Sequence, residues 1–122
     1  MPGTQLSEEA AAAQDPEISA QALVPATLQT GVVAAGKDSP GWKLLDGEGP
    51  RWHEVQVTFP QAFRFQPTVR VMLTGSDILD GANHRLTAYP TEITKGGFKL
   101  MFHTWANTRV WSVAVTWMAH SS

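Results

Sequence analysis

Residues 97–117 read GFKLMFHTWANTRVWSVAVTW, and this stretch decides the fold. In its first part the apolar residues Phe98, Leu100 and Phe102 alternate with more polar ones, and the alternation returns between Trp111 and Trp117. Successive side chains of a β-strand point to opposite faces of the sheet, so a period of two indicates strands that bury one face. The stretch therefore predicts two such strands.

The same alternation recurs upstream in four shorter stretches, which we interpret as further strands. They cover residues 29–33, 55–59, 69–74 and 85–89. Clusters of Gly, Pro, Asn and Asp separate them, which is typical of turns between short antiparallel strands. The predicted fold class is all-β, a six-stranded antiparallel β-sandwich formed by residues 28–122.

Residues 1–27 differ from the rest, because they are rich in Ala, Gln and Pro and carry no pattern of a core. Ser7 can cap a short helix over residues 8–14, with Glu8 and Glu9 at the favourable end of the helix dipole, and Asp15-Pro16 would end it. We expect an N-terminal leader or linker. The alternative is an anchor that orders against another subunit or a larger assembly.

Composition excludes several classes of protein. The chain of 122 residues has the length of one domain, and its net charge of −2 without a clustered basic patch argues against a nucleic-acid partner. It contains no cysteine for disulfides or thiolate metal sites, and no apolar run approaches the roughly 20 residues that a membrane span needs. Acidic residues interrupt the N-terminus, so no signal peptide is predicted. We expect synthesis in the cytosol, with later release or incorporation into a virion or extracellular particle left open.

The sequence carries no local pattern of an active site. It lacks a nucleophile elbow, a Gly-rich phosphate loop and the two-histidine helix motif of zinc proteases. Its four histidines are scattered singly, and residues 77–81 lack the alternating oxygen ligands of a calcium loop. We therefore predict no enzyme activity, no cofactor and no metal.

Tryptophan usage is unusual, with five Trp beside five Phe and one Tyr. Trp105 is out of phase with the apolar face of its strand and shares the other face with Lys99 and His103, which suits a subunit interface or a ligand platform. Trp111 is in phase with Val113 and the apolar residues after it. Core packing alone would explain Trp111, although a ligand contact at the start of the strand is compatible with the same pattern.

Three segments of the C-terminal half resemble the H-type lectin family. They are TKGGFKL at 94–100, TWANTRVW at 104–111 and VTWMA at 115–119, and the similarity extends from about residue 29 to residue 120. The family includes snail agglutinins and the C-terminal domain of slime-mould discoidins. The resemblance implies a six-stranded sandwich that forms trimers, sometimes stacked as hexamers, and binds galactose or N-acetylgalactosamine.

The resemblance also implies a carbohydrate-binding site. Arg85 matches the arginine that hydrogen-bonds the axial 4-hydroxyl of galactose, and Asn83 belongs to the same Asn-x-Arg segment. Trp105 and Trp111 match aromatic contacts from the neighbouring protomer. Arg85 is out of phase with the apolar residues beside it, as an outward-pointing ligand contact requires. An inter-subunit salt bridge is the structural alternative.

This chain departs from the family pattern at several points. The acidic hydroxyl acceptor is expected in the loop after Trp42, where Asp46 or Glu48 can serve, or can simply be solvated turn residues. Ala106 replaces a histidine that lies near the acetamido group in the snail lectin, so the choice between galactose and N-acetylgalactosamine stays open. The cysteines of that lectin are absent, so a trimer must hold by packing alone.

Two functions follow from the sequence. The first is a trimeric lectin whose clefts lie at subunit boundaries and gain avidity by binding clustered glycans together. The alternative is a structural or receptor-binding component, such as a phage-tail or virion decoration, built on the same trimeric fold and attached through residues 1–27.

Overall fold

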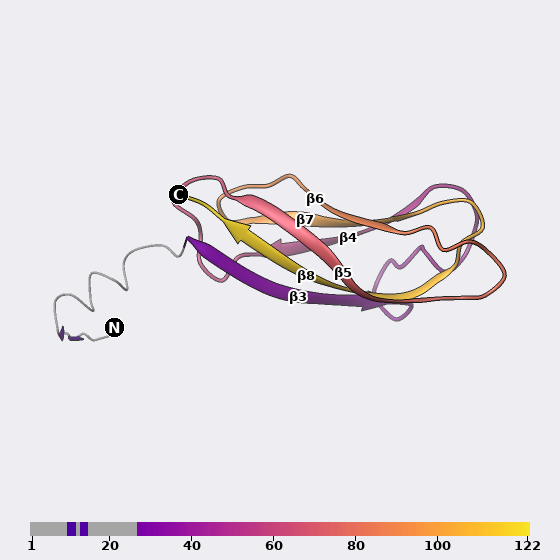
Figure 1. Cartoon of the computed structure of the whole chain (residues 1–122), viewed down its shortest axis with the longest axis horizontal. Coiled ribbons are helices and arrows are strands. Elements are labelled where there is room, and N and C mark those ends of the chain that lie inside the picture. The colour runs from indigo at the N-terminus through magenta and orange to yellow at the C-terminus, as the bar shows by residue number, and fades with distance from the viewer. Residues whose placement is uncertain (1–9, 12, 15–26) are drawn as a thin grey trace.

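The computed structural model describes residues 10–11, 13–14 and 27–122. Six long strands form two three-stranded antiparallel sheets that pack face to face (Figure 1), which confirms the predicted β-sandwich. One sheet has the strand order β3-β8-β5 and the other β4-β7-β6. The strand bounds are β3 Leu28–Gly36, β4 Arg51–Thr58, β5 Thr68–Ile78, β6 Thr87–Thr91, β7 Gly97–Thr104 and β8 Val110–His120.

The two strands of the stretch 97–117 are the central strands of the two sheets. β8 pairs with β3 on one side and β5 on the other, and β7 pairs in the same way with β4 and β6. A central strand has neighbours on both edges and the opposite sheet over one face, so its inward side chains lie far from water. This position explains why the alternation of apolar residues is clearest in that part of the sequence.

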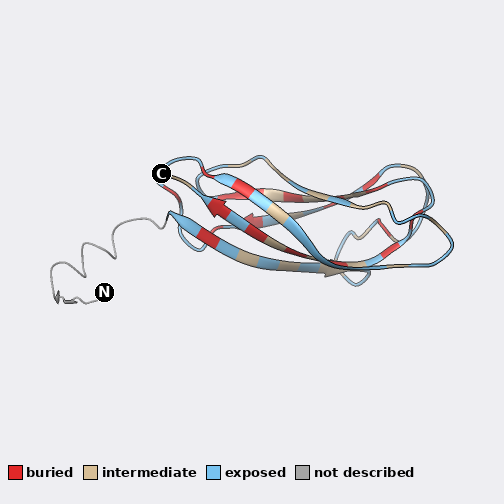
Figure 2. Ribbon diagram, in the orientation of Figure 1, coloured by how far each residue is buried: buried red, intermediate tan, exposed pale blue. Residues whose placement is uncertain are grey.

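The core lies between the two sheets, as the burial colours of Figure 2 show. Phe98, Leu100 and Phe102 of β7 are fully buried, which confirms the predicted inward face of that strand. The ring of Phe59 lies 5.7 Å from that of Phe98 and 5.6 Å from that of Trp117, and these tilted contacts tie the sheets together.

Trp111 lies outside the core. Its side chain is 38% exposed, so the interpretation of Trp111 as a core residue is wrong. The register explains the error: Asp77 pairs with Ser112 and Ile78 pairs with Val110, which leaves Trp111 as the extra residue of a β-bulge. A bulge shifts the alternation by one position, so a residue in phase with the core in the sequence turns outward in the structure.

Of the helix predicted over residues 8–14, the structure describes only Ala10–Ala11 (β1) and Ala13–Gln14 (β2), which are two-residue strands. The helix prediction is wrong at these residues. Residues 1–9, 12 and 15–26 lie outside the described part of the chain, and with them most of the predicted leader, whose role as linker or anchor stays a prediction.

Gly97→Ala tests the close approach of β7 to β4. A Cβ at Gly97 would overlap the carbonyl oxygen of Val57, a backbone atom that cannot move without distorting the ladder, whereas a Cβ at Gly96 would meet open space. We expect Gly97→Ala to lower the free energy of unfolding by about 1–3 kcal/mol, as overpacking typically does. Denaturant unfolding of both variants measures this, with Gly96→Ala as the matched control. Equal stability of the two variants would show that the close approach of β7 to β4 does not require glycine at position 97.

Candidate functional site

Three loops meet at one end of the sandwich, at the right of Figure 1: residues 37–50 between β3 and β4, 79–86 between β5 and β6, and 105–109 between β7 and β8. The 105–109 turn lies between the other two. The amide of Gly49 donates to the carbonyl of Ala106 at 2.9 Å, and the amide of Leu79 donates to the carbonyl of Arg109 at 3.0 Å. The loops therefore form one hydrogen-bonded unit.

Arg51 is the polar centre of this unit, and sequence reasoning missed it. Its side chain is only 9% exposed, and burial lowers the pKa of the guanidinium, with nearby Arg109 adding to the effect and Glu48 opposing it. A buried cation is stable only when its donors are satisfied. The guanidinium donates at 2.8–3.4 Å to five backbone carbonyls, those of Leu44, Asp46, Gly49, Ala106 and Thr108.

Two buried threonines fix the backbone of the loop that carries Arg85. The hydroxyl of Thr104 donates to the carbonyl of Arg85, and the hydroxyl of Thr108 donates to the carbonyl of Asn83, each at 2.5 Å. Both threonine side chains are fully buried. The spacing of Thr104 and Thr108 in the TWANTRVW segment therefore has a structural reason, because one threonine lies on each side of the turn and both hold the 83–85 backbone.

The Arg85 guanidinium is oriented by the same turn. One terminal nitrogen donates to Asn107 Oδ1 at 3.1 Å and to Thr108 Oγ1 at 3.2 Å. Within the described part of the chain, its other donors make no hydrogen bond or ion pair. An arginine carries five N–H donors, so this half-buried side chain keeps several for a ligand.

Asp46 and Glu48 lie in the 37–50 loop, which hydrogen-bonds to the turn beside Arg85. Both carboxylates are exposed, and neither forms a hydrogen bond or ion pair with another described residue. The exposed side chain of Asn83 lies on the opposite loop. Both acids of this loop are thus open to a ligand, and the expectation that one of them acts with Arg85 stays a prediction.

Trp105 lies on the outer face of the β4-β7-β6 sheet, which confirms that its face is the one opposite to the core. Its exposed ring lies 5.1 Å from that of His103. His103 in turn stacks on Trp52 of β4, with ring centroids 4.4 Å apart and planes 7° from parallel. The three rings form an aromatic row, Trp52-His103-Trp105, that ends next to the Arg85 loop.

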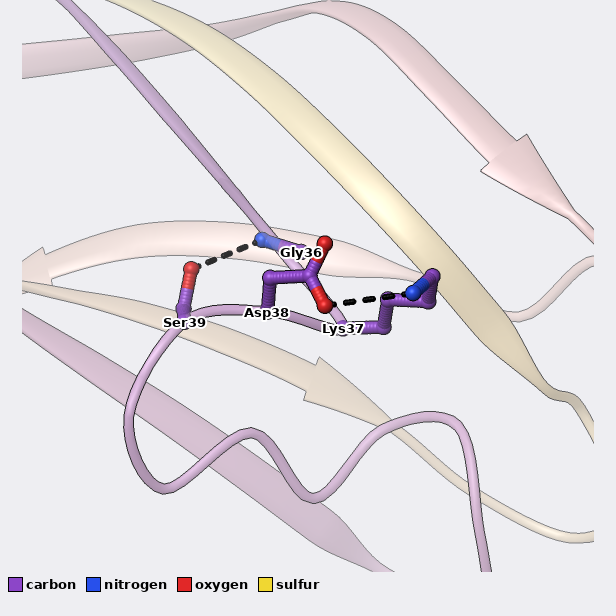
Figure 3. A network of polar contacts seen from close by, with 4 residues as sticks. All are labelled: Gly36, Lys37, Asp38 and Ser39. Atoms are coloured by element: carbon purple, nitrogen blue, oxygen red, sulfur yellow. Dashed lines mark hydrogen bonds and ion pairs between the residues drawn. The ribbon is translucent and has the colours of Figure 1, made fainter.

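Trp111 does not lie beside Trp105 in the chain. It lines a hollow of about 790 Å³ on the β3-β8-β5 sheet, together with residues 34–40 and 75–77. The ammonium of Lys37 lies 5.0 Å from the centre of its ring. Lys37 belongs to the turn in Figure 3, in which Gly36 N donates to Ser39 Oγ at 3.0 Å and Lys37 pairs with Asp38 at 3.1 Å.

The described residues contain neither a candidate metal site nor a candidate membrane span. No group of three His, Cys, Asp or Glu side chains in residues 27–122 converges on a point where a metal ion could be held. In the part of the chain that the structure describes, no helix is long and apolar enough to cross a membrane.

A sequence profile of the H-type lectin domain matches residues 54–120, more than half of the chain. This chain belongs to the H-type lectin family. The match spans β5–β8 and most of β4, and includes both threonines that fix the Arg85 loop. Membership identifies this H-type lectin as a carbohydrate-binding domain and confirms the resemblance seen in the sequence.

Known proteins support the assignment of this H-type lectin. Two structures of discoidin II from Dictyostelium discoideum, the native recombinant and the wild-type protein, superpose with TM-scores of 0.68 and 0.70 at 31% and 30% identity. They cover 75% and 81% of this chain, which spans only 35% and 37% of discoidin II. "ATP synthase subunits region ORF 7" of Fuscovulum blasticum is 37% identical over 82 residues, which are 67% of this chain and 71% of that protein.

Arg51→Ala tests whether this arginine organises the loop end of the lectin. Five carbonyls lose a charged donor, so we expect the free energy of unfolding to fall by about 2 kcal/mol or more. The amides of Gly49 and Val110, which bond across the loops, should exchange with solvent faster, as hydrogen exchange read by NMR measures.

Arg64→Ala is the control for the loss of a positive charge, because Arg64 is exposed and should change stability by less than about 0.5 kcal/mol. Unchanged stability and exchange in Arg51→Ala would contradict the role given to Arg51.

Proposed function

We propose that this lectin binds terminal galactose or N-acetylgalactosamine at its loop end, with Arg85 as the principal hydrogen-bond donor. The proposal rests mainly on the state of the Arg85 guanidinium. It is anchored by Asn107 and Thr108 and keeps unpaired donors, and the adjoining loops carry exposed acids and an exposed indole. Such an arrangement costs little to organise when a ligand arrives.

The chemistry of a galactoside suits these groups. A rigid guanidinium can donate to the axial 4-hydroxyl and its neighbour, and a carboxylate of Asp46 or Glu48 can accept from sugar hydroxyls. The indole of Trp105 can cover the apolar C–H face of the pyranose. Asn83 offers an additional amide at the rim. We expect Ala106 to contribute no side-chain contact to an acetamido group, so galactose and N-acetylgalactosamine should bind with similar affinity.

We further propose that the complete site forms between protomers of a trimer, which can pair as a hexamer. Trp105 and Trp111 are large apolar side chains that stay partly exposed, and they lie over different sheets of one protomer. Neighbouring copies would cover part of this surface and bring aromatic contacts to an Arg85 loop. Several sites on one rigid body would then bind clustered glycans with avidity.

Calorimetric titration with galactose and N-acetylgalactosamine, supported by a glycan array, tests the site. A charge-assisted hydrogen bond contributes about 1.5–3 kcal/mol, so Arg85→Ala should weaken binding about tenfold or more. Trp105→Ala should weaken it as well. Arg70→Ala removes an exposed arginine from β5 and should bind like the native protein. Ordinary affinity in folded Arg85→Ala and Trp105→Ala would rule out this assignment.

The mass of the native oligomer tests the two-protomer arrangement. Native mass spectrometry or light scattering of the full chain should give three or six times the mass of 13.3 kDa. A strict monomer at the concentrations that bind sugar would contradict a site shared between subunits.

The alternative role, a structural or receptor-binding decoration of a phage tail or virion, depends on residues 1–27. Nearly all of these residues lie outside the described part of the chain, so that role stays a prediction, together with release from the cell. Deleting the segment separates the two functions. A free lectin should keep its oligomer and its sugar binding, whereas a particle component should lose incorporation.

A further inference from the structure

A polar depression, separate from the hollow beside Trp111, lies on the β4 side of the molecule, beside the loop that follows β3. It measures about 310 Å³, at the lower end of the range for ligand pockets. None of its residues belongs to the site proposed above. Its lining residues are Pro40, Gly41, Lys43, Trp52, His53, Glu54 and Met101.

Trp52 supplies an ordered aromatic surface to this depression. His103 covers one face of its indole at 4.4 Å, and the indole N–H donates to the Tyr89 hydroxyl at 3.2 Å. The ring is therefore held on one face and at its nitrogen, yet the residue remains 44% exposed. The face that His103 leaves uncovered can pack against a ligand without further loss of side-chain freedom.

Glu54 supplies a carboxylate with spare acceptor capacity. Its side chain is 59% exposed and reaches Lys99 only at 3.6 Å, whereas Glu92 reaches the same ammonium at 3.2 Å. The hydrogen bond that Lys99 donates to Glu92 is also the largest cause of the raised pKa of Lys99, ahead of the charge of Glu54. Lys99 is thus satisfied mainly by Glu92, which leaves Glu54 able to accept hydrogen bonds from hydroxyl groups.

Lys43 contributes the opposite charge from the β3–β4 loop. Its ammonium is exposed and forms no ion pair with another residue of the described part of the chain. Lys43 and Glu54 together leave the depression without net charge. An aromatic face, an acceptor and a donor around a small neutral hollow fit the C–H face and the hydroxyls of a neutral pyranose.

We propose that this depression is a second carbohydrate subsite, which binds a neutral pyranose unit against Trp52 with Glu54 accepting from its hydroxyls. The inference takes its ligand class from the proposed lectin function but uses different residues. The aromatic row Trp52-His103-Trp105 connects the two sites, so this lectin would contact two sugar units on one protomer.

The test follows the indole N–H signals of the full-length protein by NMR during titration with methyl β-galactoside, methyl β-glucoside and lactose. Trp52→Phe and Trp105→Phe assign the two signals. At least one sugar should shift the Trp52 signal in a saturable way. Glu54→Gln should weaken that response about tenfold or more and leave the Trp105 response unchanged. Asp80→Asn is the matched control and should leave the Trp52 response unchanged, because it removes an exposed carboxylate that neither lines the depression nor pairs with Lys99.

The outcomes separate this subsite from the proposed function. In Arg85→Ala the Trp105 response should disappear while the Trp52 response persists. A Trp105 response without any Trp52 response would overturn the subsite and leave the lectin function intact. A Trp52 response that Glu54→Gln does not weaken would also overturn it, as would a change in native oligomer mass in Trp52→Phe, because this surface would then be a subunit contact. If no sugar shifted either signal, both the proposed function and the subsite would be contradicted.

Discussion

The conformation of the loop end depends on the hydrogen bonds of the buried Arg51 guanidinium. The guanidinium holds carbonyls from the loop before β4 and from the turn between β7 and β8 in one network. An arginine in this position satisfies several carbonyls with one planar group, which a lysine cannot do. Once the turn is fixed, Thr104 and Thr108 hold the backbone of Asn83 and Arg85. The β-sandwich thus supplies a rigid frame, and a few polar side chains convert three loops into one surface.

Much of the fold was predictable from the sequence, because the pleat of a strand imposes a strict period of two. Phe98, Leu100 and Phe102 lie inward as their alternation predicts. The same rule fails for Trp111, since the bulge adds one residue to β8 and a bulge has no signature in the alternation itself. Sequence reasoning could have found Arg51, which is in phase with Val55 and Val57 on the inward face of β4. A charged residue at a core position signals a buried network.

The candidate site was predicted only in part. The TWANTRVW segment was one of three that pointed to the family, and the structure explains its two threonines through the backbone of the Arg85 loop. Asp46 and Glu48 could not be told apart from the sequence, because alternation and spacing do not encode the conformation of the loop that carries them. The sequence placed Trp105 and His103 on one face but did not add Trp52 to them, because Trp52 lies opposite His103 only through the register of β4 on β7.

A crystal structure of the full chain with N-acetylgalactosamine would show whether Arg85 binds the sugar. We expect the sugar at the loop end, with its axial 4-hydroxyl at a hydrogen-bond distance of about 2.7–3.2 Å from the Arg85 guanidinium. We also expect an indole from a neighbouring subunit against the pyranose ring. Sugar bound away from Arg85, or a loop end that stays empty at saturating sugar while remaining open to solvent, would contradict the proposed role of Arg85.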